Sequence, residues 1–343
     1  MKYIGLDAHP ATFTLAVVDE EGKVINHVKR STSGKNLIEV VSQVTGPKQL
    51  AVEESTLAQW ISITLEPYVA DLTICDPRQN RWIAEADYAD DKTSAVKLAQ
   101  LLRGGYLKAI RHPDRKMAEL RRMFRHYYDL NHQLTRFKNK VKAFFRQAGV
   151  HPSGNSVYRN DEREHWLSHL KDWRGLLHRT SDCLTVVDLL EEMKSGIRNK
   201  MSQVARNADR SSYRILRGVP GVGPVVATGY MAIIVTPERF SRKNKLWSYA
   251  GFGNTQHESG ETVSTEGTSN EGNKVLKWVV TQHYQAAIRT SWDGSPCRFA
   301  RKSSQLQQKG LDQQARRRSI CRTLLSVIRG VWRKGEPYRE RQR

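Results

Sequence analysis

Cysteine is scarce in this chain, and its scarcity limits the kinds of fold that the sequence can specify. Among 343 residues there are four cysteines, at positions 75, 183, 297 and 321. They are far apart and show none of the paired spacings of a zinc site, which excludes a disulfide framework and predicts reduced thiols in a cytosolic protein. Long apolar runs are also missing, so we expect neither secretion nor a membrane span.

A glycine-rich turn is absent after the first apolar segment, which excludes a dinucleotide-binding fold. The N-terminal region instead alternates short apolar segments with amphipathic ones. This pattern predicts strands at 2–6, 12–18, 23–28, 49–53 and 71–75, and helices at 36–44, 57–68 and 91–102. Three antiparallel strands followed by helix-linked parallel strands is the order of a ribonuclease H-like α/β fold, which we assign to residues 1–110.

Acidic side chains are in the minority. The formal net charge is +21 and the pI is about 10.0, which favours a polyanionic partner. The charge is uneven, because residues 1–95 hold 9 Lys/Arg and 14 Asp/Glu, a net charge of −5, and the remaining residues therefore carry +26. We expect the catalytic module and the nucleic-acid-binding surface to lie in different parts of the chain.

Residues 111–208 are predicted to form a helical coiled coil. Apolar side chains at 120, 123, 127, 130, 134, 137, 141 and 144 alternate spacings of three and four, which is a heptad pattern. A second seam at 186, 190, 193, 197, 201 and 204 predicts another helix, so the two pair with each other, with a second subunit, or both. Residues 209–330 are predicted to be a mostly helical C-terminal domain, and residues 331–343 a basic tail.

Carboxylates stand at the ends of two predicted strands and at the start of a predicted helix. They are Asp7, Glu53 and Asp91. Carboxylates that converge from different elements can bind Mg²⁺ or Mn²⁺, because hard cations prefer oxygen ligands. The alternative is that each acid merely caps a loop or a helix.

Neighbouring acids leave the ligand set open. Glu54 competes with Glu53, and strand alternation allows only one of the two to face the site. Asp87 and Asp90 compete with Asp91. One helical turn after Asp91, where a further acid would share its face, the residue is Ser94, which brings no charge.

Two features of the basic part of the chain favour contacts with phosphate. Residues 218–224 read Gly-Val-Pro-Gly-Val-Gly-Pro, a helix-hairpin-helix pattern in which Gly221 and Gly223 would let the backbone approach a phosphate, or else a plain turn between helices. Residues 111–150 hold 11 Lys/Arg and 3 Asp/Glu, an excess that favours nucleic acid over a merely solvated coiled-coil flank. The candidate ligands on this helix are Arg121, Arg122, Arg125, Arg136, Lys138, Lys140 and Lys142.

A polar stretch at 256–261 contains Ser259 beside a glycine. A serine on an exposed loop can reach a phosphate, but no Ser-His-Asp arrangement is recognisable nearby. From the residues alone a hydrogen-bonding role is favoured, and Ser264, Thr265 and Ser269 are equally good candidates.

Several segments occur in a recognisable order. They are Asp7-Ala-His, Val52-Glu-Glu-Ser, Cys75-Asp-Pro-Arg, Asp91-Lys-Thr-Ser, the 218–224 turn, Tyr249-Ala-Gly-Phe-Gly, His257-Glu-Ser-Gly and Ser269-Asn-Glu-Gly-Asn-Lys. In this order they resemble the DEDD transposases of bacterial insertion sequences, the bridge-RNA-guided recombinases. The resemblance covers residues 2–290.

This resemblance implies more than the residues show. It implies an N-terminal domain similar to Holliday-junction resolvases, with Mg²⁺ bound by acids that fall on Asp7, Glu53 and Asp91. It implies that Ser259 attacks a DNA phosphate and forms a covalent phosphoserine. It also implies that the partners are element-end DNA, target DNA and a structured guide RNA. It implies a dimer, or a tetramer on DNA, in which one subunit supplies the acids and another the serine, and a cytoplasmic, nucleoid-associated protein.

This chain departs from the family's pattern at two positions. Ser94 stands where the family has its fourth acid, so Asp90 is an alternative ligand, and Thr56 stands where a glycine often follows the glutamate motif. Two other functions therefore stay open, a structure-selective nuclease that uses only the carboxylates and water, and an inactive relative that binds RNA and DNA.

Overall fold

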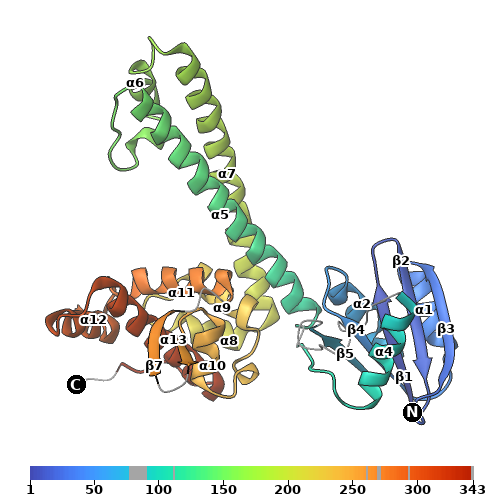
Figure 1. Cartoon of the computed structure of the whole chain (residues 1–343). Coiled ribbons are helices and arrows are strands. Elements are labelled where there is room, and N and C mark those ends of the chain that lie inside the picture. The colour runs from blue at the N-terminus through green and yellow to red at the C-terminus, as the bar shows by residue number, and fades with distance from the viewer. Residues whose placement is uncertain (77–90, 111–112, 260–261, 269–271, 293, 341–343) are drawn as a thin grey trace. The chain divides into compact units, whose positions relative to one another are not determined.

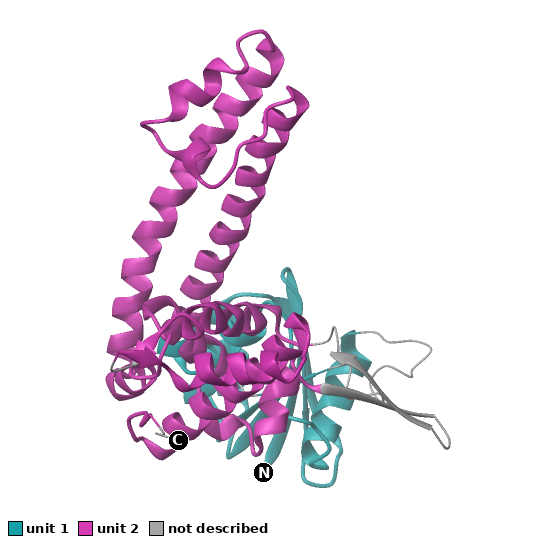
Figure 2. Cartoon of the chain, turned by 90° about the vertical axis from the view of Figure 1, so that its left-hand side faces the viewer, with its two compact units in different colours: residues 1–118 teal, residues 119–343 magenta. Residues whose placement is uncertain are grey.

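The computed structural model describes residues 1–76, 91–110, 113–259, 262–268, 272–292 and 294–340. The chain forms two compact units, Met1–Ala118 and Glu119–Arg343 (Figure 2). Among the described residues, no helix combines the length and the hydrophobicity that a membrane span requires.

Unit 1 is built on a five-stranded mixed sheet with the order β3-β2-β1-β4-β5 (Figure 1). The strands are β1 (Lys2–Ala8), β2 (Thr12–Val18), β3 (Val24–Ser31), β4 (Lys48–Glu53) and β5 (Asp71–Cys75), and the helices are α1 (Gly34–Gln43), α2 (Ala58–Leu65), the 3₁₀ turn η1 (Glu66–Tyr68) and α4 (Asp91–Arg103). The first three strands pair antiparallel, and β4 and β5 join in parallel. The mixed α/β sheet agrees with the predicted strand order and is consistent with a ribonuclease H-like domain.

The two faces of this sheet are filled differently. The face covered by α1 and α2 holds the main apolar core, to which the strands contribute Ile4, Leu6, Phe13, Leu15, Val17, Leu50 and Val52. The other face carries small residues under α4, because Gly5 lies beside Ala16 of β2 and Ala51 of β4. A Cβ at Gly5 would lie 2.0 Å from the carbonyl oxygen of Ala95, so glycine at this position lets α4 pack directly on β1.

Two long helices, α5 (Arg115–Gln147) and α7 (Arg174–Ala208), lie side by side in both views (Figures 1 and 2). The 3₁₀ turn η3 (Ser156–Tyr158) and α6 (Arg163–Ser168) connect them at one end. An apolar cluster there joins both long helices to the connection, through Val141, Phe145, Val157, Leu170 and Leu184. The pairing of the two predicted helices within one chain is confirmed.

The two predicted apolar seams differ in outcome. Most of the first is buried, namely Leu120, Tyr127, Leu130, Leu134, Val141 and Phe144. The second seam is borne out in part: Met201 is buried, and the residues at 186, 190, 197 and 204 are half-buried, whereas Met193 is 43% exposed and the unpredicted Leu184 and Val187 are buried. A polar contact also lies midway along the pair, where Lys138 Nζ is 2.6 Å from Glu191 Oε1.

The rest of unit 2 surrounds α9 (Pro224–Ile234), which is buried from Val226 to Ile234. α8 (Arg210–Arg217) and α11 (Lys274–Ala287) pack on α9, and α13 (Gln313–Lys334) in turn packs on α8, α11, the 3₁₀ turn η4 (Pro237–Arg239), α10 (Lys243–Tyr249) and α12 (Arg298–Gln308). The region is mostly helical, as predicted. It also contains two antiparallel strand pairs that the sequence did not predict, β6 (Asn254–Ser259) with β7 (Thr262–Thr268) and the short β8 (Ser291–Trp292) with β9 (Ser295–Pro296).

Candidate active site

A row of polar side chains crosses four strands of the sheet in unit 1. Asp7 of β1 pairs with Thr14 of β2, and Thr14 pairs with Lys29 of β3. On the other side Leu6 is in register with Val52, so Asp7 and Glu53 are the next residues of two parallel strands. Because alternate residues share a face, Asp7 lies on the same side of β1 as Gly5, the side that α4 covers.

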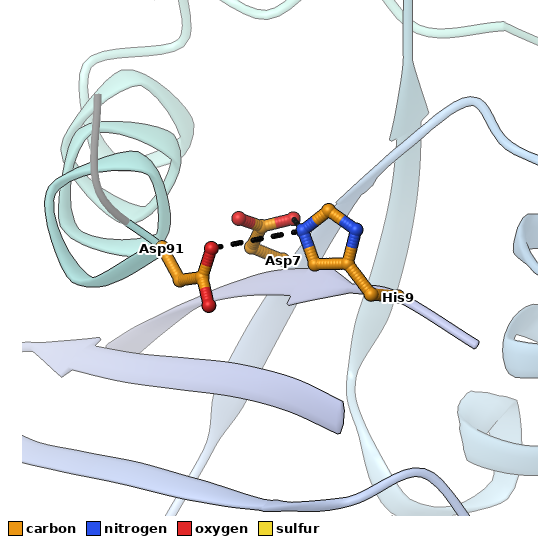
Figure 3. Close-up of side chains that lie close together, drawn as sticks. All are labelled: Asp7, His9 and Asp91. Atoms are coloured by element: carbon orange, nitrogen blue, oxygen red, sulfur yellow. Dashed lines mark ion pairs between the residues drawn. The ribbon is translucent and has the colours of Figure 1, made fainter. Parts of the chain in front are cut away.

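The packing of α4 brings a second carboxylate to Asp7. Asp91 begins α4, about one turn before the Ala95 carbonyl that contacts Gly5. His9 lies between the two acids, with its Nε2 3.4 Å from Asp7 Oδ1 and 3.8 Å from Asp91 Oδ1 (Figure 3). One ligand atom from each of the three residues lies within 4.8 Å of the others. On its other oxygen Asp91 accepts a hydrogen bond from Lys29 Nζ at 2.7 Å.

The environment of Asp7 and Glu53 disfavours the charged forms of these two acids. Burial raises the pKa of Asp7 above its usual 3.8, and the charge of Asp91 raises it further, while His9 and Lys29 act in the opposite direction. Burial also raises the pKa of Glu53, and the neighbouring charge of Asp7 adds to this effect. A cation at the site would offset the repulsion that adds to burial in raising both pKa values.

The residues fit a divalent cation. Asp7 and Asp91 supply oxygen ligands from two elements, and the half-buried Glu53 lies close enough to interact electrostatically with Asp7. The buried hydroxyl of Thr14, next to Asp7, has no hydrogen-bond partner among the described residues. His9 was not predicted as a site residue from the sequence, although its position two residues after Asp7 indicated that the two side chains could lie on the same face of the strand.

The competing acids have different outcomes. Glu54, the competitor of Glu53, is exposed at the end of β4. Asp87 and Asp90 lie outside the described residues. Ser94 lies in the first turn of α4, next to the Ala95 that packs on Gly5.

Ser259 is the last residue of β6, where it pairs with Thr262, the first residue of β7. It therefore lies at the tip of a β-hairpin rather than on an irregular loop. Its competitors Ser264 and Thr265 lie within β7, and Ser269 lies outside the described residues.

The 218–224 turn connects α8 to α9. Gly221 has a φ of +81°, and a Cβ on it would lie 2.6 Å from the backbone nitrogen of Ala287. The close packing against α11 is by itself enough to require glycine at this position. Gly223 caps the N-terminus of α9 without a side-chain hydrogen bond, and a Cβ on it would meet nothing within 4 Å.

A buried histidine, which sequence reasoning did not single out, holds this turn. His283 Nε2 lies 3.0 Å from the carbonyl oxygen of Pro220, and its Nδ1 lies 2.8 Å from the hydroxyl of Tyr230. Burial lowers the pKa of His283 to about 4. The ring is therefore neutral near pH 7, and since a carbonyl can only accept, Nε2 donates to Pro220 and Nδ1 accepts from Tyr230.

The candidate nucleic-acid ligands on α5 divide into two groups. Four of the seven make contacts within unit 2: Arg121 donates to the carbonyl of Ala232, Lys138 binds Glu191, Lys142 donates to the carbonyl of Gly154, and Arg122 pairs with Glu119. Arg125, Arg136 and Lys140 are exposed. Their side chains form no hydrogen bond or ion pair within the part of the chain that the structure describes.

Two family models match separate parts of the chain. A transposase model, of the DEDD type of IS110 elements, matches residues 4–150, which include Asp7, Glu53 and Asp91. The model of the transposase IS116/IS110/IS902 family matches residues 213–296, which include the glycine turn and Ser259. No curated protein matches the chain.

Proposed function

Because the chain belongs to the IS110 family of DEDD transposases, enzymes that cleave and transfer DNA strands, we propose that it acts through a covalent bond between Ser259 and a DNA phosphate. A divalent cation, Mg²⁺ or Mn²⁺, would be held by Asp7, Asp91 and Glu53. The observation that carries this proposal is the convergence of Asp7 and Asp91 from two separate elements, within 4.8 Å, inside the segment that matches the DEDD transposase model.

In the proposed reaction the Oγ of Ser259 forms a bond to phosphorus while the bond from phosphorus to one sugar oxygen breaks. The serine proton passes to a base, and the departing sugar oxygen is protonated. When bound, the cation supplies charge stabilisation to the transferring phosphoryl group. One phosphoester bond replaces another, so the reverse attack by a sugar hydroxyl can rejoin a strand without a high-energy cofactor.

The acids have distinct parts in this proposal. Asp7 and Glu53 project from neighbouring strand ends and would form the rigid side of the cation site. Lys29 donates a hydrogen bond to Asp91 and orients that carboxylate. His9 lies between Asp7 and Asp91 and limits the approach of their two charges to each other.

We propose further that a structured guide RNA pairs with the element and target DNA, and that the active assembly is a dimer or a tetramer. The excess of positive charge outside residues 1–95 supports a nucleic-acid partner, and the exposed Arg125, Arg136 and Lys140 on α5 are candidates for RNA phosphates. Co-purified RNA is the readout: sequencing of nucleic acid bound to the wild-type protein should return one structured transcript encoded beside the gene.

The covalent mechanism is tested by trapping. With a DNA substrate carrying its recombination site and Mg²⁺, the wild-type protein should give a protein–DNA adduct in denaturing gels, and Ser259→Ala should give neither adduct nor strand exchange. Ser264→Ala is the matched control and should retain both. Cleavage that persists in Ser259→Ala without an adduct would instead support a metal-dependent nuclease.

The metal requirement is tested with Asp7→Asn. This variant should bind DNA as the wild type does and lose cleavage over the whole Mg²⁺ and Mn²⁺ range. If the wild-type protein itself never cleaves at any metal concentration, the chain is a binding relative only. Mixing Asp7→Asn with Ser259→Ala tests whether acids and serine act from different subunits, because such an arrangement should restore activity in the mixture.

A further inference from the structure

A cavity of about 440 Å³ lies between α7, α8 and the first residue of α9, within unit 2. This volume falls in the range of about 300–1,000 Å³ that is typical of ligand sites. Three of its lining residues are basic, Arg198, Lys200 and Arg206, and none is acidic. It lies mostly in the stretch between the two segments that match family models, and none of its basic residues was among the sequence candidates.

The basic side chains of this cavity have no partner that explains their grouping. Arg198, Lys200 and Arg206 are exposed and form no side-chain hydrogen bond or ion pair with any residue that the structure describes. By contrast, Lys138 of α5 is paired with Glu191 and Arg163 of α6 with Asp188. A basic trio in a cavity whose lining contains no acid favours an anionic ligand.

Tyr213 of α8 is the second, independent observation. Its side chain lines the cavity and is only 8% exposed, yet its hydroxyl has no hydrogen-bond partner among the described residues. The hydroxyl is not among the buried atoms that lack a partner, so it retains access to solvent. A buried ring that presents an unpaired hydroxyl to a basic cavity is a preformed donor for a ligand oxygen.

The backbone at the cavity edge adds further donors. Pro224, which lines the cavity, is the first residue of α9, and Gly223 before it caps that helix without any side chain. The first-turn N–H groups of α9 therefore have no side-chain acceptor, and the N-terminus of a helix favours an anion. Two side-chain amides, Asn199 and Gln203, complete the lining from α7.

We propose that this cavity is a binding site for a phosphodiester group of nucleic acid. Arg198 and Arg206 carry the charge, Tyr213 donates a directed hydrogen bond, and the amides contact the adjoining sugar or base edge. The proposal depends on the proposed function only in taking the ligand to be nucleic acid. It assigns to the end of the α7 helix and the glycine turn a shared role in holding the strand backbone.

The test is equilibrium binding of the full-length protein, followed by fluorescence anisotropy over a series of KCl concentrations. The probes are a mixed-sequence single-stranded RNA and a mixed-sequence duplex DNA. The double variant Arg198→Gln/Arg206→Gln removes two charges at the cavity. The matched control, Arg210→Gln/Arg214→Gln, removes two exposed charges from α8 that do not line it.

If the cavity binds phosphate, the salt dependence of log K should become shallower in the cavity variant. Each lost contact is worth a slope of about 0.7 for a single strand and about 0.9 for duplex DNA, so two contacts predict changes of about 1.4 and 1.8. A change with RNA alone identifies RNA phosphates as the ligand, and a change with DNA alone identifies DNA phosphates. Tyr213→Phe, which keeps the buried ring, should weaken binding about tenfold without changing the slope.

The proposal is overturned if the cavity variant and its control have the same affinity and the same salt slope with both probes. It is also overturned if the cavity variant alters only the self-association of the protein, which would identify a protein partner. Ser259→Ala separates this result from the proposed function. That variant should lose the covalent adduct and keep wild-type binding, so a failure of either proposal leaves the other measurable.

Discussion

The close contact between Gly5 and α4 offers the sharpest test of how the fold creates the candidate metal site. Gly5→Ala adds a Cβ that would lie 2.0 Å from the carbonyl oxygen of Ala95 and 2.6 Å from the backbone nitrogen of Ala99. Ordinary contact begins at 3.4 Å, so α4 must retreat from β1 by about 1.4 Å or the strand must deform. Both contacts are to backbone atoms, which cannot rotate away.

Two effects of different size should follow. Overpacking of this kind costs about 1–3 kcal/mol of unfolding free energy, which unit 1 can absorb while remaining folded. The larger effect is on the site, because Asp91 begins α4 and moves with it away from Asp7. A displacement of about 1 Å at a site can cost about 100-fold in rate, so we expect cleavage to fall by about that factor and the Mn²⁺ requirement to rise.

The assay pairs thermal unfolding with cleavage rates over a Mn²⁺ titration. The control is Gly34→Ala, where a Cβ would meet the Trp60 ring at 3.7 Å and the Thr64 methyl group at 4.0 Å, both ordinary contacts. This control should match the wild type in both measurements. Wild-type metal dependence in a folded Gly5→Ala protein would refute the idea that the glycine contact places Asp91.

Three further predictions concern groups whose environment the structure defines. Because the pKa of Asp7 is raised, the folded state holds the Asp7 proton more tightly than the unfolded state does, and stability is lost as pH rises above 3.8. Thermal unfolding scans should therefore find Asp7→Asn more stable than the wild type at neutral pH but not at low pH. His283 behaves oppositely, because its pKa is lowered to about 4, so its contribution to the free energy of unfolding is present above pH 6.5 and is lost as pH falls toward 4. His283→Phe should lower the free energy of unfolding measured in urea by about 2–5 kcal/mol, because it leaves the Tyr230 hydroxyl and the Pro220 carbonyl unpaired. Gly221→Ala should cost about 2–4 kcal/mol in the same urea experiment, whereas Gly223→Ala should cost less than about 1 kcal/mol, and equal costs would contradict the packing argument.

Local patterns in the sequence were enough to predict the sheet. Strands β1, β2, β4 and β5 each contain a short apolar run, and the connections imposed the antiparallel and then parallel order. The same reasoning located Asp7, Glu53 and the start of α4, because strand ends and helix starts are local features. It grouped Asp91 with Asp7 from the order of the elements alone, while the contact itself depends on Gly5, Ala16 and Ala51, which allow α4 to approach the sheet.

Features that depend on tertiary partners were less predictable. The second helical seam was only partly right, with Met201 buried and Met193 exposed, because a heptad pattern counts apolar residues and does not include a polar contact such as that of Lys138 with Glu191. The hairpin of β6 and β7 was missed because its residues are mostly polar, small or β-branched, without apolar alternation. Basic residues on α5 looked equivalent in sequence, although Arg121 and Lys142 bond to backbone carbonyls of unit 2.

The positive charge of Lys29 beside Asp91 helps to explain why a serine at position 94 is compatible with this site. Lys29 already donates to one oxygen of Asp91, so the α4 side of the site carries less negative charge than its acids alone suggest. Ser94 adds none. Burial raises the pKa of Asp7 and of Glu53, the charge of Asp91 raises that of Asp7 further, and the charge of Asp7 raises that of Glu53, so these two acids gain most from a cation. The strand ends would therefore supply most of the affinity for metal. The helix would supply orientation, and that division makes the Gly5 contact more consequential than the identity of residue 94.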